Sequence, residues 1–286
     1  MKQNINSGEF LKNNRTTNWR ARTFSALKKL LYNPLFLSFL FFECSSSLYL
    51  VEWVVDGDTI RLKNGWSIRY LLINTPELGE IFSLEATQKN RELTENQWVR
   101  LEFDVQKMDA YGRYLAFVFS KSKMVNQVLV EEGFAHLLII PPNRKYQSVL
   151  LEAQKKAQKE KKGIWSTEEY STLLHISSFR ANPEGNENED PNREYVRIVN
   201  ITSQSLSLKG FQVKDNQGNT YTFGDILLPP GYSVLLYSGV GADKLGPSEQ
   251  LRVYWNSPLP IWNNEGDVCF IYDSEGNLIT RKVYEP

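Results

Sequence analysis

The sequence predicts a mainly β protein with three helices, organised as two successive domains. Short runs rich in β-branched and aromatic residues alternate with turn residues along most of the chain. Helical patterns are confined to residues 83–162, and from Leu173 onward only strand and turn patterns occur. A chain of 286 residues is long enough for each of two domains to bury a hydrophobic core.

Residues 48–166 contain strands first and helices later, which predicts an α+β domain. Asn64-Gly65, a strong hairpin turn signal, separates the first two strands. Ser83 is the expected N-cap of the first helix, and Gly133 is the expected C-cap of the second. The expected strands are Val51–Leu62, Ser67–Ile73, Arg100–Phe103 and Tyr114–Phe119, and the expected helices are Ser83–Asn96, Met124–Glu132 and Arg144–Lys162.

Residues 167–171 are a polar linker, and residues 172–286 predict a small β-sandwich. Strand patterns occur in YVRIVN, FQVKDNQGNTYTF, SVLLYSG and VCFIYDSEGNLI. Asn and Gly residues within and between these segments mark hairpin turns. Short strands at regular spacing with such turns are typical of a sandwich.

The net charge is zero, but it is unevenly distributed. Residues 1–47 carry a charge of +5, residues 48–166 carry +2, and residues 167–286 carry −7. An acidic C-terminal third is a poor general clamp for nucleic acid. With only two cysteines no disulfide framework is implied, and two histidines argue against a histidine-based zinc site.

Residues 1–47 resemble a signal or anchor segment. Basic residues precede the apolar run PLFLSFLFF, which is too short to cross a bilayer as a helix. The following ECSSS resembles a bacterial lipoprotein cleavage site. We therefore expect export, either as a secreted protein or with Cys44 lipidated and attached to the membrane. The alternative is a disordered arm followed by a short buried segment.

The stretch VVDGDTIRLKNGWSIRYLLINTPE, residues 54–77, carries more charged and polar groups than a hairpin needs. Two strand-connected loops could bring Asp58, Asn74 and Glu77 together. Oxygen ligands of this kind suit a hard cation such as Ca²⁺ and do not suit zinc. Arg69 lies in an otherwise apolar strand, where a guanidinium is costly unless it pairs with an anion.

A second arginine, Arg113, precedes another apolar strand in DAYGRYLAF. Two guanidiniums can hold a phosphate, a metal ion can polarise its oxygens, and a carboxylate can activate water. Together these groups indicate phosphodiester cleavage. The alternative is structural: Asp-Gly is only a turn, and Arg69 pairs with Glu77 as a buried ion pair.

The motifs DGDTIRL, IRYLLINTPE and DAYGRYLAFV, in this order, closely resemble the staphylococcal nuclease (thermonuclease) family. The resemblance covers roughly Leu48–Ser166 and implies an OB-fold β-barrel with three helices that cleaves DNA and RNA with Ca²⁺. It implies that the side chain of Asp58 and the carbonyl of Thr75 bind the metal, together with Asn74. It further implies that the catalytic residues are Arg69, Glu77 and Arg113, and that Tyr111 lines the nucleotide pocket.

The sequence departs from the family pattern at three places. Asn74 stands where the family has a second calcium-binding aspartate, which predicts weaker calcium affinity. Ala110 replaces a basic residue, and Leu138 and Ile140 replace two pocket tyrosines. The joint presence of the arginines and Glu77 favours an active enzyme. The alternative is a catalytically silent surface adhesin or nucleic-acid-binding protein on the same scaffold.

The segments EYVRIVNITSQSLSLKG, LLPPGYSVLLYSG and WNNEGDVCFIYDSEGNLI resemble a lamin-tail domain, an immunoglobulin-like β-sandwich. The residues themselves have structural explanations, with Leu208, Val213 and Val234 expected in the core and Cys269 expected as a buried thiol. This fold does not set a function. The resemblance allows a role in targeting or anchoring to an unknown protein or surface partner.

Overall fold

The computed structural model describes residues 47–246 and 248–286. The expected signal or anchor segment, and with it the lipidation of Cys44, lies outside the described residues apart from Ser47. Within the described ranges, no helix is both long enough and apolar enough to cross a membrane. The precise domain boundaries drawn from the sequence stay predictions.

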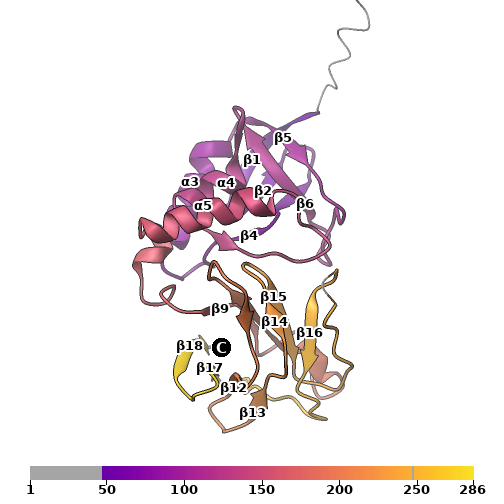
Figure 1. Ribbon diagram of the computed structural model, residues 1–286. Coiled ribbons are helices and arrows are strands. Elements are labelled where there is room, and N and C mark those ends of the chain that lie inside the picture. The colour runs from indigo at the N-terminus through magenta and orange to yellow at the C-terminus, as the bar shows by residue number, and fades with distance from the viewer. Residues whose placement is uncertain (1–46, 247) are drawn as a thin grey trace, which may run out of the picture. The chain divides into compact units, whose positions relative to one another are not determined.

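The first part of the chain is a closed five-stranded barrel, as expected (Figure 1). The sheet order is β3-β2-β1-β5-β6-β7. A parallel pairing of β3 with β6, in which Ile68 lies opposite Tyr114, closes the first five of these strands into the barrel, and β7 pairs with β6 outside this ring. Gly65, with φ +88°, forms the expected turn between β2 and β3. The strands are β1 (Leu48–Asp56), β2 (Thr59–Leu62), β3 (Ser67–Tyr70), β4 (Ile73–Asn74), β5 (Trp98–Glu102), β6 (Tyr114–Ser120), β7 (Lys123–Met124) and β8 (His136–Leu137).

Three α-helices lie together on one side of the barrel: α3 (Ser83–Thr94), α4 (Val125–Glu131) and α5 (Gln147–Lys159). The capping prediction for Ser83 is wrong, because Phe82, in the left-handed conformation, precedes the helix and Ser83 is its first residue. The third helix begins three residues later than expected. The carboxylate of Asp104 accepts the backbone N–H groups of Arg144 and Lys145 at 2.6 and 2.8 Å, and this loop contact holds them outside the helix.

The barrel core contains fully buried aliphatic and aromatic side chains from the strands and helices, including Ile60, Ile68, Phe117, Leu129 and Leu150. Alternate strand residues point inward, as the two-residue period of a strand requires. In β2, for example, Ile60 and Leu62 are buried while Arg61 between them is partly exposed. A short 3₁₀ turn, η1 (Gly163–Ser166), ends this part of the chain.

The second part is a β-sandwich of two four-stranded sheets, ordered β16-β15-β10-β9 and β13-β12-β17-β18. Leu208, Val213, Val234 and Cys269 are buried in its core, as expected, and Trp262 is buried with them. The elements are β9 (Leu174–Arg180), η2 (Pro191–Arg193), β10 (Tyr195–Asn200), β11 (Leu206–Ser207), β12 (Gln212–Lys214), β13 (Thr220–Thr222), β14 (Leu227–Leu228), β15 (Ser233–Tyr237), β16 (Leu251–Tyr254), β17 (Asp267–Tyr272) and β18 (Leu278–Tyr284).

Backbone hydrogen bonds join the sandwich to the barrel. The N–H of Ile139 donates to the carbonyl of Gly231 at 2.7 Å. Gly231 has φ +75°, and a Cβ there would lie 2.8 Å from the Cβ of Leu137, so the close approach requires glycine. Gln154 of α5 accepts the N–H of Leu137 at 2.7 Å and donates to the carbonyl of Ile201 at 3.1 Å.

The linker between the two parts is packed, although its sequence is polar. Tyr170 is buried in a cluster with Trp165 from the barrel side and Val199 and Ile201 from the sandwich. Its ring also stacks on His175, with centroids 4.4 Å apart. His175 therefore has an aromatic partner that the sequence did not reveal, and the two parts share an apolar contact surface.

Gln154 offers a test of this junction. Gln154→Leu leaves the N–H of Leu137 without its partner and removes one of the two donors to Ile201. Each unpaired buried polar group costs about 1–3 kcal/mol, so we expect the free energy of unfolding to fall by roughly 2–4 kcal/mol in urea denaturation. Gln158→Leu is the matched control and should cost under about 1 kcal/mol, because Gln154 still donates to Ile201. Equal losses in the two variants would contradict the assignment.

Glu194 predicts how the stability of the sandwich depends on pH. Its carboxylate accepts the backbone N–H of Ile261 at 2.8 Å, and burial nevertheless raises its pKa from 4.5 to about 7. The folded state binds the carboxyl proton of Glu194 more tightly than the unfolded state does. The protonated group therefore stabilises the fold fully below pH 4.5, and this stabilisation is lost as pH rises through 7. We expect the free energy of unfolding to decrease over this window by about 2–3 kcal/mol.

The measurement is urea denaturation at a series of pH values. Glu194→Gln should flatten this part of the profile, because the amide does not titrate. Glu265→Gln, which changes an exposed carboxylate of the same sandwich, should leave the profile unchanged. A profile in which Glu194→Gln keeps the full slope would show that another group titrates there.

Candidate active site

A tight turn between β1 and β2 places Asp58 at the base of the candidate site. Gly57 precedes it, and a Cβ at this position would lie 2.6 Å from Oγ1 of Thr75. The carboxylate of Asp58 accepts the backbone N–H of Thr75 at 2.9 Å, and Asp58 is 4% exposed. The small turn therefore locks the Asp58 loop against the segment that follows β4.

Arg69 is the centre of the site. Its guanidinium pairs with the carboxylate of Asp58 at 3.0 Å and donates to Oδ1 of Asn74 at 2.8 Å. It also donates to the backbone carbonyls of Tyr70 and Ile73, at 2.9 and 3.0 Å. These contacts settle one open alternative: among the described residues, the carboxylate paired with Arg69 is Asp58, and Glu77 forms no salt bridge with it.

The oxygens of Asp58, Asn74 and Thr75 belong to one hydrogen-bonded cluster. The amide of Asn74 donates to the carbonyl of Thr75 at 3.1 Å, and Thr75 donates to Asp58. A carboxylate, an amide oxygen and a carbonyl are the donor types that a hard cation binds. Within residues 47–246 and 248–286 there is no cluster of three His, Cys, Asp or Glu side chains with metal-ligand spacing. The oxygen atoms of Asp58, Asn74 and Thr75 are therefore of the types that bind Ca²⁺, and only the Asp58 ligand is a carboxylate.

Burial and neighbouring charges raise the pKa of two carboxyl groups in the site. Loss of hydration raises the pKa of Asp58 to about 6, against the opposing effect of Arg69 and with a contribution from Asp56. Loss of hydration also raises the pKa of Glu77, again opposed by Arg69 and reinforced by Asp56. Glu77 keeps contact with solvent, which screens these charges. The negative charge at this end of the site exceeds what Arg69 neutralises.

Arg113 enters the site from the loop before β6. Asp109 positions Arg113. The carboxylate of Asp109 accepts hydrogen bonds from the Nε–H of Arg113 at 2.8 Å and from its backbone N–H at 2.9 Å. Gly112, with φ +77°, lets this loop turn tightly. Tyr111 is 70% exposed, and its ring centroid lies 5.6 Å from the guanidinium carbon of Arg113. An exposed ring beside an arginine can stack on a base.

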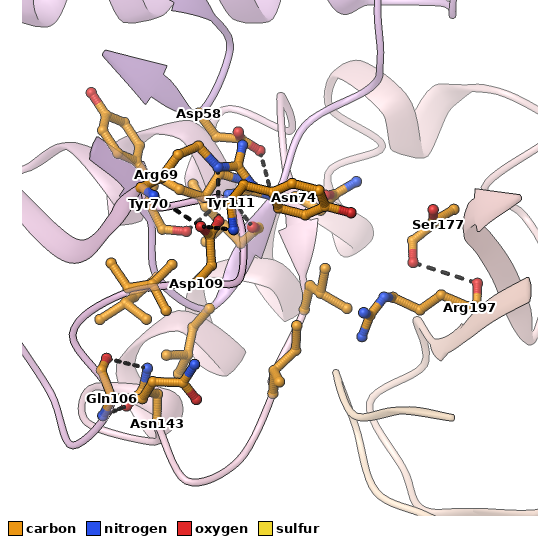
Figure 2. A pocket seen from close by; sticks show the side chains of 18 of the residues that line it. Asp58, Arg69, Tyr70, Asn74, Gln106, Asp109, Tyr111, Asn143, Ser177 and Arg197 are labelled. Carbon is orange, nitrogen blue, oxygen red and sulfur yellow. Dashed lines mark hydrogen bonds and ion pairs between the residues drawn. The ribbon is translucent and has the colours of Figure 1, made fainter. Parts of the chain in front are cut away.

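One cavity of about 390 Å³ brings these groups together (Figure 2). Its lining includes the expected residues Asp58, Arg69, Asn74, Glu77, Arg113 and Tyr111. Thr75 does not line the cavity, but its backbone N–H donates a hydrogen bond to Asp58, which does. Leu138 and Ile140 also line the cavity, so apolar side chains stand where the family resemblance implies tyrosines.

Sequence reasoning missed several residues of this cavity. Asp56 and Asp109 line it from the barrel, and Ser177, Ser178, Tyr195 and Arg197 line it from the sandwich. The Asp109 role has a local signal, because an aspartate four residues before the arginine can cap the loop that carries it. Tyr195 and Arg197 alternate in YVRIVN and therefore share one face of a strand, but nothing in the sequence tells which surface that face meets.

Two family models match the chain. The staphylococcal nuclease homologue model matches residues 67–167, and the Lamin Tail Domain model matches residues 167–286. The first match begins after Asp58 and contains Arg69, Glu77 and Arg113. The nuclease and lamin-tail assignments made from the sequence are confirmed.

Curated relatives match the first part of the chain. A thermonuclease of Staphylococcus hyicus is 42% identical over 133 residues, which are 43% of this chain and 79% of that protein. A thermonuclease of Staphylococcus intermedius is 39% identical over 126 residues, 41% of this chain and 75% of that protein. The SPbeta prophage-derived endonuclease YokF of Bacillus subtilis is 37% identical over 133 residues, 43% of this chain and 45% of that protein. With this barrel, this motif order and these relatives, the chain belongs to the staphylococcal nuclease homologue family and contains a nuclease domain.

Proposed function

We propose that the protein is a calcium-dependent nuclease that hydrolyses phosphodiester bonds of DNA or RNA. The observation that carries this proposal is the convergence of Asp58, Arg69, Glu77 and Arg113 on one cavity. These residues come from four separate segments of the barrel. Their meeting provides two guanidiniums for a phosphate and a carboxylate for water.

Each residue has a distinct role in the proposed reaction. Arg69 and Arg113 bind the non-bridging phosphate oxygens and stabilise the charge that develops on them. Glu77 accepts a proton from the water that attacks phosphorus, and the raised pKa of its carboxyl makes it a better proton acceptor. The bond from phosphorus to the leaving oxygen breaks as the new bond to water forms, and solvent protonates the leaving oxygen. Tyr111 lies where it can contact a base.

Asp58, Asn74 and Thr75 are the residues that would hold Ca²⁺. The bound ion would supply polarisation of a phosphoryl oxygen. With one carboxylate among these three donors, weak calcium affinity is expected, which suits a compartment where calcium is abundant. The basic region, the apolar run and Cys44 in the sequence support export, and a lipidated Cys44 would attach the protein to the membrane. The sandwich would then assist targeting or anchoring.

A silent nucleic-acid-binding protein is the second candidate function. Two observations favour it: Asn74 removes a carboxylate from the calcium ligands, and both terminal nitrogens of the Arg69 guanidinium already contact Asp58, Asn74 and backbone carbonyls. Under this alternative the chain binds single-stranded nucleic acid in the same cavity and does not cleave it.

Cleavage of single-stranded DNA by the purified full chain, in calcium or in chelator, tests the proposal. We expect cleavage in calcium, none in chelator, and a loss of at least about 100-fold in kcat for Glu77→Gln, because a positioned general base contributes that much. Glu85→Gln removes an exposed carboxylate from the first turn of α3 and is the matched control, with unchanged kcat. Undiminished cleavage by Glu77→Gln would refute the role of Glu77, and binding without any turnover would favour the silent scaffold.

Asn74→Asp tests the calcium donors directly. A second carboxylate beside Asp58 adds charge to the site, so the calcium concentration for half-maximal cleavage should fall, by roughly tenfold. The measurement is a calcium titration of activity and, independently of activity, of the thermal midpoint. Asn64→Asp, in the distant β2–β3 turn, is the control and should leave both titrations unchanged. Identical titrations for Asn74→Asp and the original chain would place the metal elsewhere.

A further inference from the structure

One face of the sheet β16-β15-β10-β9 carries a row of tyrosines and arginines set by strand pairing. Tyr195 on β10 lies opposite Arg180 on β9 and Tyr237 on β15, and Tyr237 lies opposite Tyr254 on β16. Directly opposed residues of paired strands project from the same face of a sheet. This row therefore crosses all four strands.

A second row runs beside the first. Arg197, two residues after Tyr195, lies opposite Ser178 and Leu235, and Leu235 lies opposite Arg252. The intervening residue Val196 is fully buried in the core of the sandwich, so the arginines and tyrosines point away from that core. We call this surface the tyrosine–arginine face, and its members, all partly exposed, are Arg180, Tyr195, Arg197, Tyr237, Arg252 and Tyr254.

The arginines of this face have no acidic partner among the residues that the structure describes. Arg197 donates to Oε1 of Gln250 at 2.9 Å and to the hydroxyl of Ser233 at 3.4 Å, both neutral groups. Nε of Arg252 is buried and makes no hydrogen bond within the described ranges. A guanidinium that is partly buried without a counter-charge is costly, and an anionic ligand on its exposed side would relieve that cost.

The tyrosines provide a row of aromatic surface. The ring centroids of Tyr195 and Tyr237 lie 5.9 Å apart, and those of Tyr237 and Tyr254 lie 5.4 Å apart with planes 20° apart. Arginines beside partly exposed rings are the elements that bind single-stranded nucleic acid, because bases stack on the rings and guanidiniums hold the phosphates. Four adjacent strands spaced at about 4.8 Å make the face about 14 Å wide.

The face is continuous with the candidate active site. Ser178, Tyr195 and Arg197 line the same cavity as Arg69 and Arg113. Figure 2 shows the side chain of Arg197 extending from its strand toward this cavity. Tyr111 from the barrel and Tyr195 from the sandwich both line this cavity, so aromatic side chains from the two parts border the same space.

We propose that the tyrosine–arginine face binds the single-stranded polynucleotide on one side of the scissile phosphate. This inference rests on the proposed function for the identity of the ligand. Phosphates contact Arg180, Arg197 and Arg252, and unpaired bases stack on the tyrosine rings. The net charge of −7 in residues 167–286 opposes nucleic-acid binding in general, and Asp243 lies at the edge of the face, where it accepts the backbone N–H of Tyr254. Within the described ranges, however, none of the arginines of this face forms a salt bridge with a carboxylate, so their charge is available to phosphates.

Fluorescence anisotropy of a labelled oligothymidylate of about a dozen nucleotides, with the full chain in chelator, tests this inference. Arg252→Gln should weaken binding several-fold and reduce the slope of log Kd against log salt by about 0.7, since one phosphate contact is lost. Arg281→Gln removes the same charge from β18 in the other sheet and should leave both values unchanged. Equal effects of the two changes would overturn the proposal.

Tyr254 separates stacking from charge. Tyr254→Leu keeps apolar bulk but removes the ring, and the expected loss in affinity is roughly tenfold. Tyr254→Phe keeps the ring and should bind within about twofold of the original chain. Tighter binding of duplex DNA than of the single strand would also overturn the proposal, since paired bases cannot stack on the tyrosines. If Tyr254→Leu fails to fold, Arg252→Gln still decides the question.

A failure of this inference can be distinguished from a failure of the proposed nuclease function, because binding in chelator does not require turnover. A chain that binds the oligothymidylate through this face without cleaving it refutes only the nuclease proposal. A chain that cleaves single-stranded DNA, with Arg252→Gln and Tyr254→Leu binding normally, refutes only this inference.

Discussion

The ion pair between Arg69 and Asp58 joins the strands and loops that form the candidate site. Through it, β3 is tied to the β1–β2 turn, and through its other hydrogen bonds Arg69 holds Asn74 and the backbone after β3. Breaking a buried pair of this kind costs about 3–5 kcal/mol, because one charge stays buried without its partner. The raised pKa of Asp58 shows that the pair does not fully offset the loss of hydration. The site is therefore a place where a further positive charge would be favourable.

The sandwich is part of the site's architecture as well as a separate fold. It contacts the barrel through Gly231 and Ile139, through the two hydrogen bonds of Gln154, and through the apolar cluster around Tyr170. These contacts set Tyr195 and Arg197 into the wall of the cavity. The lamin-tail domain therefore contributes part of the wall of the candidate site.

Local patterns allowed most of the fold to be predicted from the sequence. The alternation of the buried Ile60 and Leu62 with the partly exposed Arg61, and the Asn64-Gly65 turn, specify strands through contacts between near neighbours. The errors occur where contacts outside the local pattern decide. Asp104, 40 positions before Arg144, accepts the N–H groups of Arg144 and Lys145 and delays the third helix. The ring of Tyr170 stacks on His175 only five positions away, although the linker that carries it is polar in sequence.

For the site, the sequence by itself determined which chemical groups are present: the order of the motifs supplied Asp58, Arg69, Glu77 and Arg113 and indicated phosphodiester chemistry. Only the tertiary structure decided which groups meet. It paired Arg69 with Asp58 rather than Glu77, and it brought Arg197 from the sandwich into the same cavity. The physical reason is that residue type and spacing fix local conformation and chemistry. The partners of a buried charge depend instead on strand closure and domain packing, which involve residues more than a hundred positions apart in the chain.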